Sequence, residues 1–253
     1  MKDGYEDCRL KIHRAKEHVQ DLQTRMAKIT ADDSYVITVQ PDPNGGDDLI
    51  KLSAVQVIPG EILCVIGDAV HNLRTALDFA MNHMVGTPTR FTKFTVCDTR
   101  NELIASVNGG LKNYASKDVI DFIVNFVQPY QGGRGEAIWA IHELDIKDKH
   151  GTLIAHRELK FVTGIKGIDE RSEEFEVPTW LIVDGLVATE KLGGHQNVKI
   201  TNKGRPSLQV IFGKGMPMEG HAVLPTLAQF VHFVGQLIED ISIGFPVWLE
   251  TSL

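Results

Sequence analysis

One long segment, residues 61–85, limits the fold of this 253-residue chain more than any other feature of its sequence. Its apolar side chains recur every three or four residues and therefore form a single stripe along a helix. The stripe consists of Ile62, Ile66, Ala69, Leu73, Leu77, Ala80 and Met84. Glycine and proline stand at both ends of the segment, as expected where a helix begins and stops. A stripe of this length needs other helices to cover it, so we expect a helical bundle.

Five further segments show helical periodicity or helix-capping residues. They are residues 5–29, 101–107, 116–127, 136–150 and 223–243. The last of them has Pro225 in its first turn and is apolar over much of its circumference. We therefore expect it to pack against the earlier long helices instead of closing a separate domain.

Two parts of the chain are predicted to form β-structure. A hairpin is expected at residues 34–57, because two β-rich runs flank Asn44-Gly45-Gly46, which supplies the positive φ angles of a turn. Between about residues 157 and 215, short β-rich runs alternate with Gly, Asp and Asn turns. Strands are expected there at residues 157–167, 174–183, 186–191, 198–202 and 207–212.

Together these elements predict an α+β protein, in which an antiparallel helical bundle carries an N-terminal β-hairpin and an antiparallel β block inserted before the last helix. We expect residues 1–253 to form a single domain. Its helical core would comprise about residues 5–150 and 223–244, with the hairpin at residues 34–57 and the β block at about residues 157–215.

Charge and composition exclude several classes of protein. The net charge of −7 disfavours bulk coating of DNA or RNA, although a local basic patch could still hold a phosphate. Cys8, Cys64 and Cys97 form no C-x-x-C pair, so neither zinc nor redox chemistry is indicated, and Cys64 is expected in the core. The acidic first residues do not resemble a secretory signal, and residues 223–238 are too few and too polar to span a bilayer. We expect a cytoplasmic protein without a membrane partner.

Opposite the apolar stripe, residues 61–85 carry a distinctive polar face. At 100° per residue it is formed by Asp68, His71, Thr75 and Asp78, with Asn72 and Arg74 at its margins. Asp, Asn and His are weaker helix formers than Glu and Lys, so a requirement other than helix formation selects them. In one interpretation the face is a structural network, with Arg74 paired to Asp78 and His71 paired to Asp68. In the other it is an open functional site.

A second polar cluster falls in the predicted helix at residues 136–150. One side of this helix would carry His142, Asp145 and Lys149, and another side would carry Glu143, Lys147 and His150. Basic residues just before Gly151 also suit a helix C-terminus, so a structural role explains part of the cluster. The candidate binding residues of both helices are Asp68, Asn72, Asp78, His142, Asp145, Asp148 and Lys149.

These residues form no recognisable metal or cofactor motif. Zinc, iron or manganese would suit His71, Asp78, His142 and His150 if the two helices faced one another, but H-x-x-x-H and E-x-x-H spacings are absent from the sequence. P-loop, dinucleotide-binding and serine hydrolase signatures are absent as well. We therefore expect neither a metal nor a cofactor.

Three strings of the sequence resemble a bacterial family for which no activity is established. They are Gly67-Asp68-Ala69-Val70-His71-Asn72-Leu73-Arg74-Thr75-Ala76-Leu77-Asp78, Gln128-Pro129-Tyr130 and Asp148-Lys149-His150. In that family a G-D-x-x-H-N-L-R-x-x-L-D helix is followed by Q-P-Y and then by D-K-H. The similarity extends over roughly residues 8–155, and it implies relatives without implying a reaction.

The chain also has a weaker resemblance to the helical HEPN superfamily, whose ribonuclease members cleave RNA without metal through an R-x(4-6)-H motif. The nearest pairs here, Arg14 with His18 and Arg74 with His83, have other spacings. Shared chemistry would imply His71 or His150 as the general acid and base, and Arg74 as the group that stabilises charge on the phosphate.

Two classes of function follow. In the first, the chain is a binding protein whose polar helix face takes a small ligand, RNA or a protein partner. In the second, it is a HEPN-like ribonuclease or nucleotide-phosphate-cleaving enzyme of a defence or toxin context, with His71, Arg74 and His150 as catalytic residues. The apolar residues between Val223 and Trp248 also favour a homo-oligomer.

Overall fold

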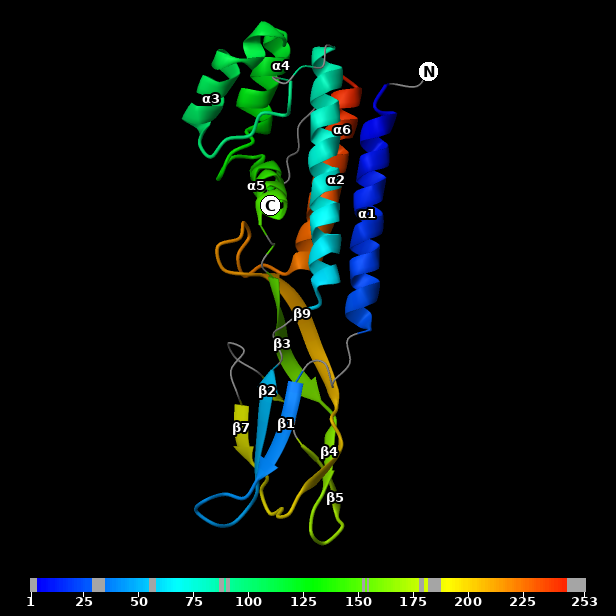
Figure 1. Ribbon diagram of the computed structural model, residues 1–253, viewed down its shortest axis with the longest axis vertical. Helices are drawn as coiled ribbons and strands as arrows, with labels where there is room; N and C mark the ends of the chain where they lie inside the picture. Colours follow the sequence, from blue (N-terminus) through cyan, green and yellow to red (C-terminus); the bar gives the residue numbers. More distant parts are fainter. Residues whose placement is uncertain are drawn as a thin grey trace. The chain divides into compact units, whose positions relative to one another are not determined.

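The computed structural model describes residues 4–28, 35–54, 58–86, 89, 92–151, 153, 155–177, 180–181 and 188–244. The chain divides into two compact units (Figure 1). The helical unit comprises Met1–Gln23, Gly60–Ile154 and Lys214–Leu253, and the β unit comprises Thr24–Pro59 and Ala155–Gly213. This confirms the predicted α+β class, with the hairpin and the β block before the last helix. The assignment of a single domain to residues 1–253 stays a prediction.

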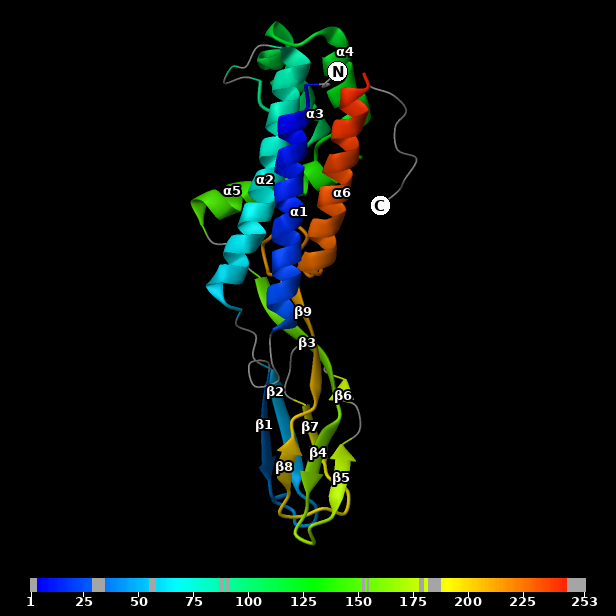
Figure 2. The ribbon, with the colours of Figure 1, turned by 90° about the vertical axis from the view of Figure 1, so that its right-hand side faces the viewer.

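The helical unit is formed by six α-helices, as far as the chain is described. They are α1 (Glu6–Ala27), α2 (Gly60–Val85), α3 (Arg100–Gly109), α4 (Lys117–Asp121), α5 (Glu136–His150) and α6 (Val223–Ser242). Figure 2 shows α1, α2 and α6 lying side by side along the unit, with α5 crossing α2. Since α1 and α2 run in opposite directions, the start of α1 and the end of α2 lie at the same end (Figure 1). No described helix is long and apolar enough to cross a membrane.

The apolar stripe of α2 forms the centre of the helical core, as predicted. Six of its seven residues, from Ile62 to Ala80, are buried, and α5 and α6 pack against the helix. The expectation for Cys64 is wrong, because its side chain is exposed. Two residues along a helix correspond to a rotation of about 200°, so the residue between Ile62 and Ile66 points away from their side.

The Q-P-Y string builds a tight turn before α5. A π-helical turn, Phe122–Val127, ends at Gln128, whose φ angle of 54° is left-handed. The Gln128 carbonyl then accepts hydrogen bonds from the amides of Tyr130 (2.9 Å) and Gly135 (3.2 Å). A Cβ atom at Gly135 would come within 2.6 Å of the Val127 carbonyl, so this close approach requires glycine. The string therefore has a structural role at the start of α5.

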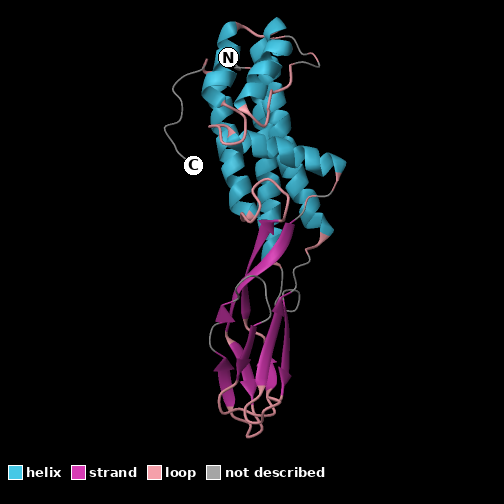
Figure 3. Cartoon of the chain, turned by 90° about the vertical axis from the view of Figure 1, so that its left-hand side faces the viewer, coloured by secondary structure: helices cyan, strands magenta, loops and turns pink. Residues whose placement is uncertain are grey.

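The described residues of the β unit form three small antiparallel sheets. Their strand orders are β1-β2-β7, β6-β3-β9 and β5-β4-β8. The strands are β1 (Tyr35–Gln40), β2 (Leu49–Ala54), β3 (Ala155–Thr163), β4 (Ile165–Ile168), β5 (Glu174–Val177), β6 (Trp180–Leu181), β7 (Ala188–Lys191), β8 (Lys199–Asn202) and β9 (Arg205–Phe212). Figure 3 shows the strands gathered in this unit and the helices in the other.

The predicted hairpin is a structural part of the β unit. Gly45 and Gly46 have the expected positive φ angles, 80° and 101°. Strand β2 also pairs with β7, from Leu49 opposite Lys191 to Leu52 opposite Ala188, which joins the hairpin to the β block. Residues from both segments, such as Tyr35, Ile50 and Leu192, are buried in one hydrophobic cluster. The hairpin is thus stabilised by strands more than a hundred residues away in the sequence.

Helix α5 packs closely on α2 at Gly67, which predicts that a methyl group there stabilises the helix less than propensity alone would. A Cβ atom at Gly67 would lie 2.4 Å from an Asp148 carboxylate oxygen, which is the far end of a flexible, partly buried side chain and can shift. We expect Gly67→Ala to change the free energy of unfolding by less than about 0.5 kcal/mol, because the shift of Asp148 offsets the gain in helix propensity. Chemical denaturation measures this change, and in the Asp148→Ala background the added methyl group should stabilise by about 0.5–1 kcal/mol.

Gly235 on α6 provides the matched control. Within the described parts of the chain, a Cβ atom there would meet only Ile12, at an ordinary 3.9 Å. Gly235→Ala should therefore raise the free energy of unfolding by about 0.5–1 kcal/mol. Equal effects at the two glycines would contradict the close packing at Gly67.

Candidate functional site

The polar face of α2 meets α5 at a buried carboxylate. The Asp145 side chain is only 4% exposed, and its two oxygens contact one basic side chain each. His71 Nδ1 lies 2.9 Å from Oδ1, and Lys149 Nζ lies 2.5 Å from Oδ2. The His71 and Lys149 side chains are 50% and 48% exposed. Asp145 therefore fixes an imidazole and an ammonium group that both reach the surface, and we call these three residues the Asp145 triad.

This pairing differs from the expected one. The sequence interpretation paired His71 with Asp68 along α2, whereas the structure pairs it with Asp145 on α5. Asp68 is exposed, and its backbone carbonyl accepts a hydrogen bond of 2.8 Å from Asn72 Nδ2. The crossing of α2 and α5 brings a better-shielded carboxylate to His71 than the helix itself provides.

Arg74 and Asp78 form the predicted pair, but in the interior. The Arg74 side chain is 7% exposed, and its Nη2 atom lies 2.9 Å from Asp78 Oδ1 and donates a hydrogen bond to the Phe94 carbonyl, also at 2.9 Å. Asp78 in turn accepts a hydrogen bond from the Phe94 amide at 2.9 Å. Burial lowers the pKa of Arg74, while Asp78 and Asp145 act in the opposite direction. These contacts hold the Phe94 backbone on α2, so the geometry gives Arg74 a structural role and does not present it to a phosphate.

The remaining candidates lie on α2 and α5 and differ in burial. Asp148 is partly buried, and its pKa is raised by burial and by the negative charges of Asp145 and Asp68. Asn72 accepts a hydrogen bond of 3.5 Å from Lys11 Nζ on α1. His150 is exposed at the end of α5. The structure thus brings together His71, Asp145 and Lys149.

His142 is a partly buried residue of α5, on the same side of the helix as Asp145 and Lys149. Its Nδ1 is buried and has no hydrogen-bond partner in the described part of the chain. Burial, followed by the positive charge of Arg74, lowers its pKa to about 4. At neutral pH this imidazole is therefore uncharged and partly buried.

The pKa of His142 predicts a loss of stability in mild acid. Its native pKa of about 4 lies below the ordinary value of 6.5, so the unfolded chain binds more protons as the pH falls from 6.5 towards 4. We expect His142→Gln to reduce the loss of unfolding free energy between pH 7 and pH 5 by about 1 kcal/mol, allowing for partial exposure. Denaturation at the two pH values measures this difference. The exposed His232→Gln should behave like the wild type, and equal pH dependence in both variants would refute the assignment.

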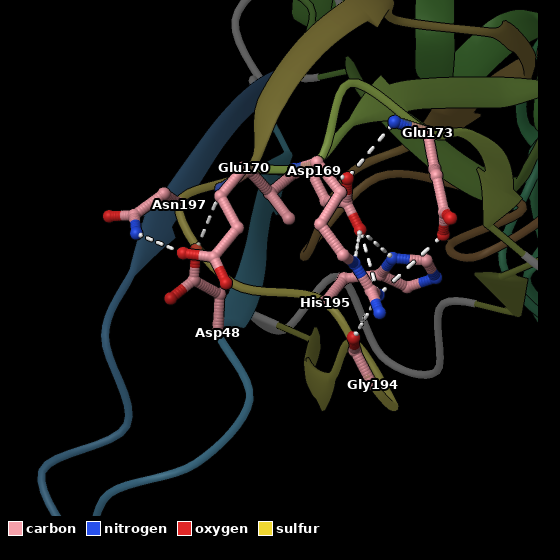
Figure 4. Close-up of polar contacts among 9 residues, drawn as sticks. Asp48, Asp169, Glu170, Glu173, Gly194, His195 and Asn197 are labelled. Atoms are coloured by element: carbon pink, nitrogen blue, oxygen red, sulfur yellow. Dashed lines mark hydrogen bonds and ion pairs between the residues drawn. The ribbon is translucent and has the colours of Figure 1, made fainter.

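A further polar cluster, which the sequence interpretation missed, lies in the β unit (Figure 4). We call it the Asp169 cluster, and it consists of Asp169, Arg171, Glu173 and His195. The Asp169 carboxylate accepts hydrogen bonds from the amides of Arg171 (2.9 Å) and Glu173 (3.0 Å), and from the Arg171 guanidinium. His195 Nδ1 lies 3.1 Å from the same carboxylate, and its ring stacks on Phe175 with 4.0 Å between centroids. Burial raises the pKa of Asp169, but the hydrogen bonds from His195, Glu173 and Arg171 outweigh it and hold the pKa well below its ordinary value.

The Asp169 cluster connects two turns. Both oxygens of the carboxylate are occupied by groups of the turn between β4 and β5 and of the loop between β7 and β8, so the cluster has a structural role. Asp favours turns because its carboxylate can accept hydrogen bonds from backbone amides a few residues later, so Asp169 is a turn signal that the sequence does offer. The partner His195, 26 residues away, is not visible in that local pattern.

Removal of the Asp169 charge should destabilise the β unit at neutral pH. Because its native pKa is lowered, the carboxylate stabilises the fold above its unfolded pKa, and this contribution is lost as the pH falls. We expect Asp169→Asn to lower the Tm by several degrees at pH 7 and by less at pH 3. Thermal unfolding by circular dichroism measures both values. Glu173→Gln, at a side chain that is 63% exposed, is the control and should leave the Tm nearly unchanged.

Comparison with known proteins matched no family model, no curated protein and no solved structure. The chemistry of the site therefore has to be argued from its residues. The Asp145 triad offers N–H donors from His71 and Lys149 to a ligand, and its buried carboxylate orients the imidazole as a proton acceptor or donor.

Proposed function

We propose that the protein is a binding protein and that the Asp145 triad takes a small anionic ligand through His71 and Lys149. The observation that carries the proposal is the buried Asp145 carboxylate, which holds both half-exposed basic groups in place. A ligand then binds groups whose geometry is already fixed, so less side-chain entropy is lost on binding. An oxygen of a phosphate or carboxylate ligand would accept hydrogen bonds from both.

The surrounding charges favour a ligand with one anionic group over a long polyanion. Burial, followed by the negative charges of Asp145 and Asp68, raises the pKa of Asp148, so carboxylates lie beside the basic groups of the triad. A chain of phosphates would have to pass these carboxylates, at an electrostatic cost. The net charge of −7 acts in the same direction. This supports a small ligand more than extended RNA.

Catalysis by His71 is the second candidate, and the His71–Asp145 pair favours it. A buried carboxylate bound to Nδ1 orients an imidazole for general acid and base catalysis through its other nitrogen. In a HEPN-like cleavage of a phosphate ester, Lys149 would take the part first given to Arg74, since Arg74 is buried. The bacterial source, the cytoplasmic location, the protein or RNA partner and the homo-oligomer stay predictions.

Loss of either basic group should weaken binding of a phosphate probe. We expect His71→Gln and Lys149→Met each to reduce the affinity for inorganic phosphate or a nucleoside monophosphate by about tenfold, because each removes one charged hydrogen bond of about 1.5–3 kcal/mol. Isothermal titration calorimetry measures the affinities. His13→Gln and Lys160→Met change exposed pairs of the same kinds elsewhere and serve as controls.

The outcomes separate the two candidates. Binding that weakens in the triad variants, without turnover of a short oligoribonucleotide, supports the binding protein. Cleavage of the oligoribonucleotide that His71→Gln abolishes supports the enzyme. Unchanged phosphate affinity in both triad variants would reject the proposed ligand site.

A further inference from the structure

A separate cluster of potential metal ligands lies where the start of α1 meets the end of α2. It consists of Asp7 and Cys8 on α1 and His83 on α2. One carboxylate oxygen, the Sγ atom and one ring nitrogen all lie within 4.8 Å of one another. His83 Nε2 lies 2.9 Å from Asp7 Oδ1. Among the described residues, this is where three His, Cys, Asp or Glu side chains come close enough to hold a metal ion.

The spacing of the donor atoms suits a tetrahedral ion. Zinc binds sulfur at about 2.3 Å and nitrogen or oxygen at about 2.0–2.2 Å, which places neighbouring ligand atoms roughly 3–4 Å apart. The three atoms here need only small side-chain rotations to meet these distances. A mixed set of thiolate, imidazole and carboxylate donors favours zinc over calcium or magnesium, which prefer oxygen ligands alone.

The three potential ligand residues differ in their exposure to solvent. Cys8 is 0% exposed, whereas the side chains of Asp7 and His83 are 46% and 34% exposed. An ion can therefore enter from the Asp7 and His83 side and reach the sulfur beneath. The ring of Tyr5 lies against His83, with 5.0 Å between centroids, and limits the movement of the imidazole. The helices that carry the three donors set where their backbones lie, and the Asp7–His83 contact already holds two of the side chains together.

We propose that Asp7, Cys8 and His83 form a binding site for zinc, with a fourth position open to water or to a small ligand. Binding replaces the thiol proton with the metal and releases that proton to the solvent. The bound ion would connect α1 to α2 at this end of the bundle. The site lies outside the Asp145 triad and does not depend on the function proposed for it.

Sequence spacing could not reveal this site. Cys8 and His83 are separated by most of two helices and a hairpin, and neither belongs to a C-x-x-C or H-x-x-x-H motif. The expectation of no metal was based on such local motifs. The antiparallel arrangement of α1 and α2 brings the residues together.

Cobalt substitution tests the proposal directly. The full-length protein loaded with Co²⁺ should show visible d–d bands of a tetrahedral ion and a thiolate-to-cobalt charge-transfer band in the near ultraviolet. Cys8→Ser should abolish the charge-transfer band, while Cys64→Ser and Cys97→Ser should retain it. A charge-transfer band that persists in Cys8→Ser, or is absent from the wild type, would overturn the proposal.

Zinc affinity gives an independent measurement on variants that are expected to fold. His83→Gln and Asp7→Asn change partly exposed side chains, and each should weaken zinc binding by about 100-fold in competition with a chromophoric chelator. His13→Gln, on the exposed face of α1, should bind like the wild type. If zinc binds the wild type no more tightly than it binds His83→Gln, the three residues form an ion pair beside a buried thiol and not a metal site.

Discussion

The buried carboxylate of Asp145 is the interaction on which the polar side of the helical unit depends. A carboxylate that is 4% exposed has to be compensated, and the compensation comes from His71 on α2 and Lys149 on its own helix. The contact between His71 and Asp145 joins α2 to α5 where the two helices cross. The compensation of Asp145 also explains why the two basic groups stay together at the surface, where a ligand can reach them.

The closeness of that crossing has further consequences. Gly67 lets the Asp148 carboxylate approach the α2 backbone, and burial together with the neighbouring negative charges raises the pKa of Asp148. Deeper in the same region, Arg74 holds the Phe94 backbone, and His142 remains uncharged. The conspicuous string from Gly67 to Asp78 thus serves two purposes. Gly67, Arg74 and Asp78 build the structure, and His71 lies at the surface.

Much of the fold could be predicted because local rules govern it. The helix expected at residues 136–150 is α5 with the same bounds, and the hairpin turn has the positive φ angles that its glycines predict. The polar pairs were harder to predict. Arg74 and Asp78 are one helical turn apart and were found, whereas His71 and Asp145 are 74 residues apart and were not. Residues on different elements meet only when the packing is known.

The sequence by itself determined the helices, most of the strand-forming segments and the residues with unusual chemistry, because periodicity, capping and turn propensity act over a few neighbouring residues. The strand expected at residues 157–167 is divided into β3 and β4, which belong to different sheets. Only the tertiary structure decided the pairing of β2 with β7, the partner of His71, the burial of Arg74 and the meeting of Cys8 with His83. Each of these depends on how amphipathic surfaces cover one another, which is a property of the whole chain. The net charge of −7 describes the chain as a whole, whereas a local site forms where packing brings particular side chains together.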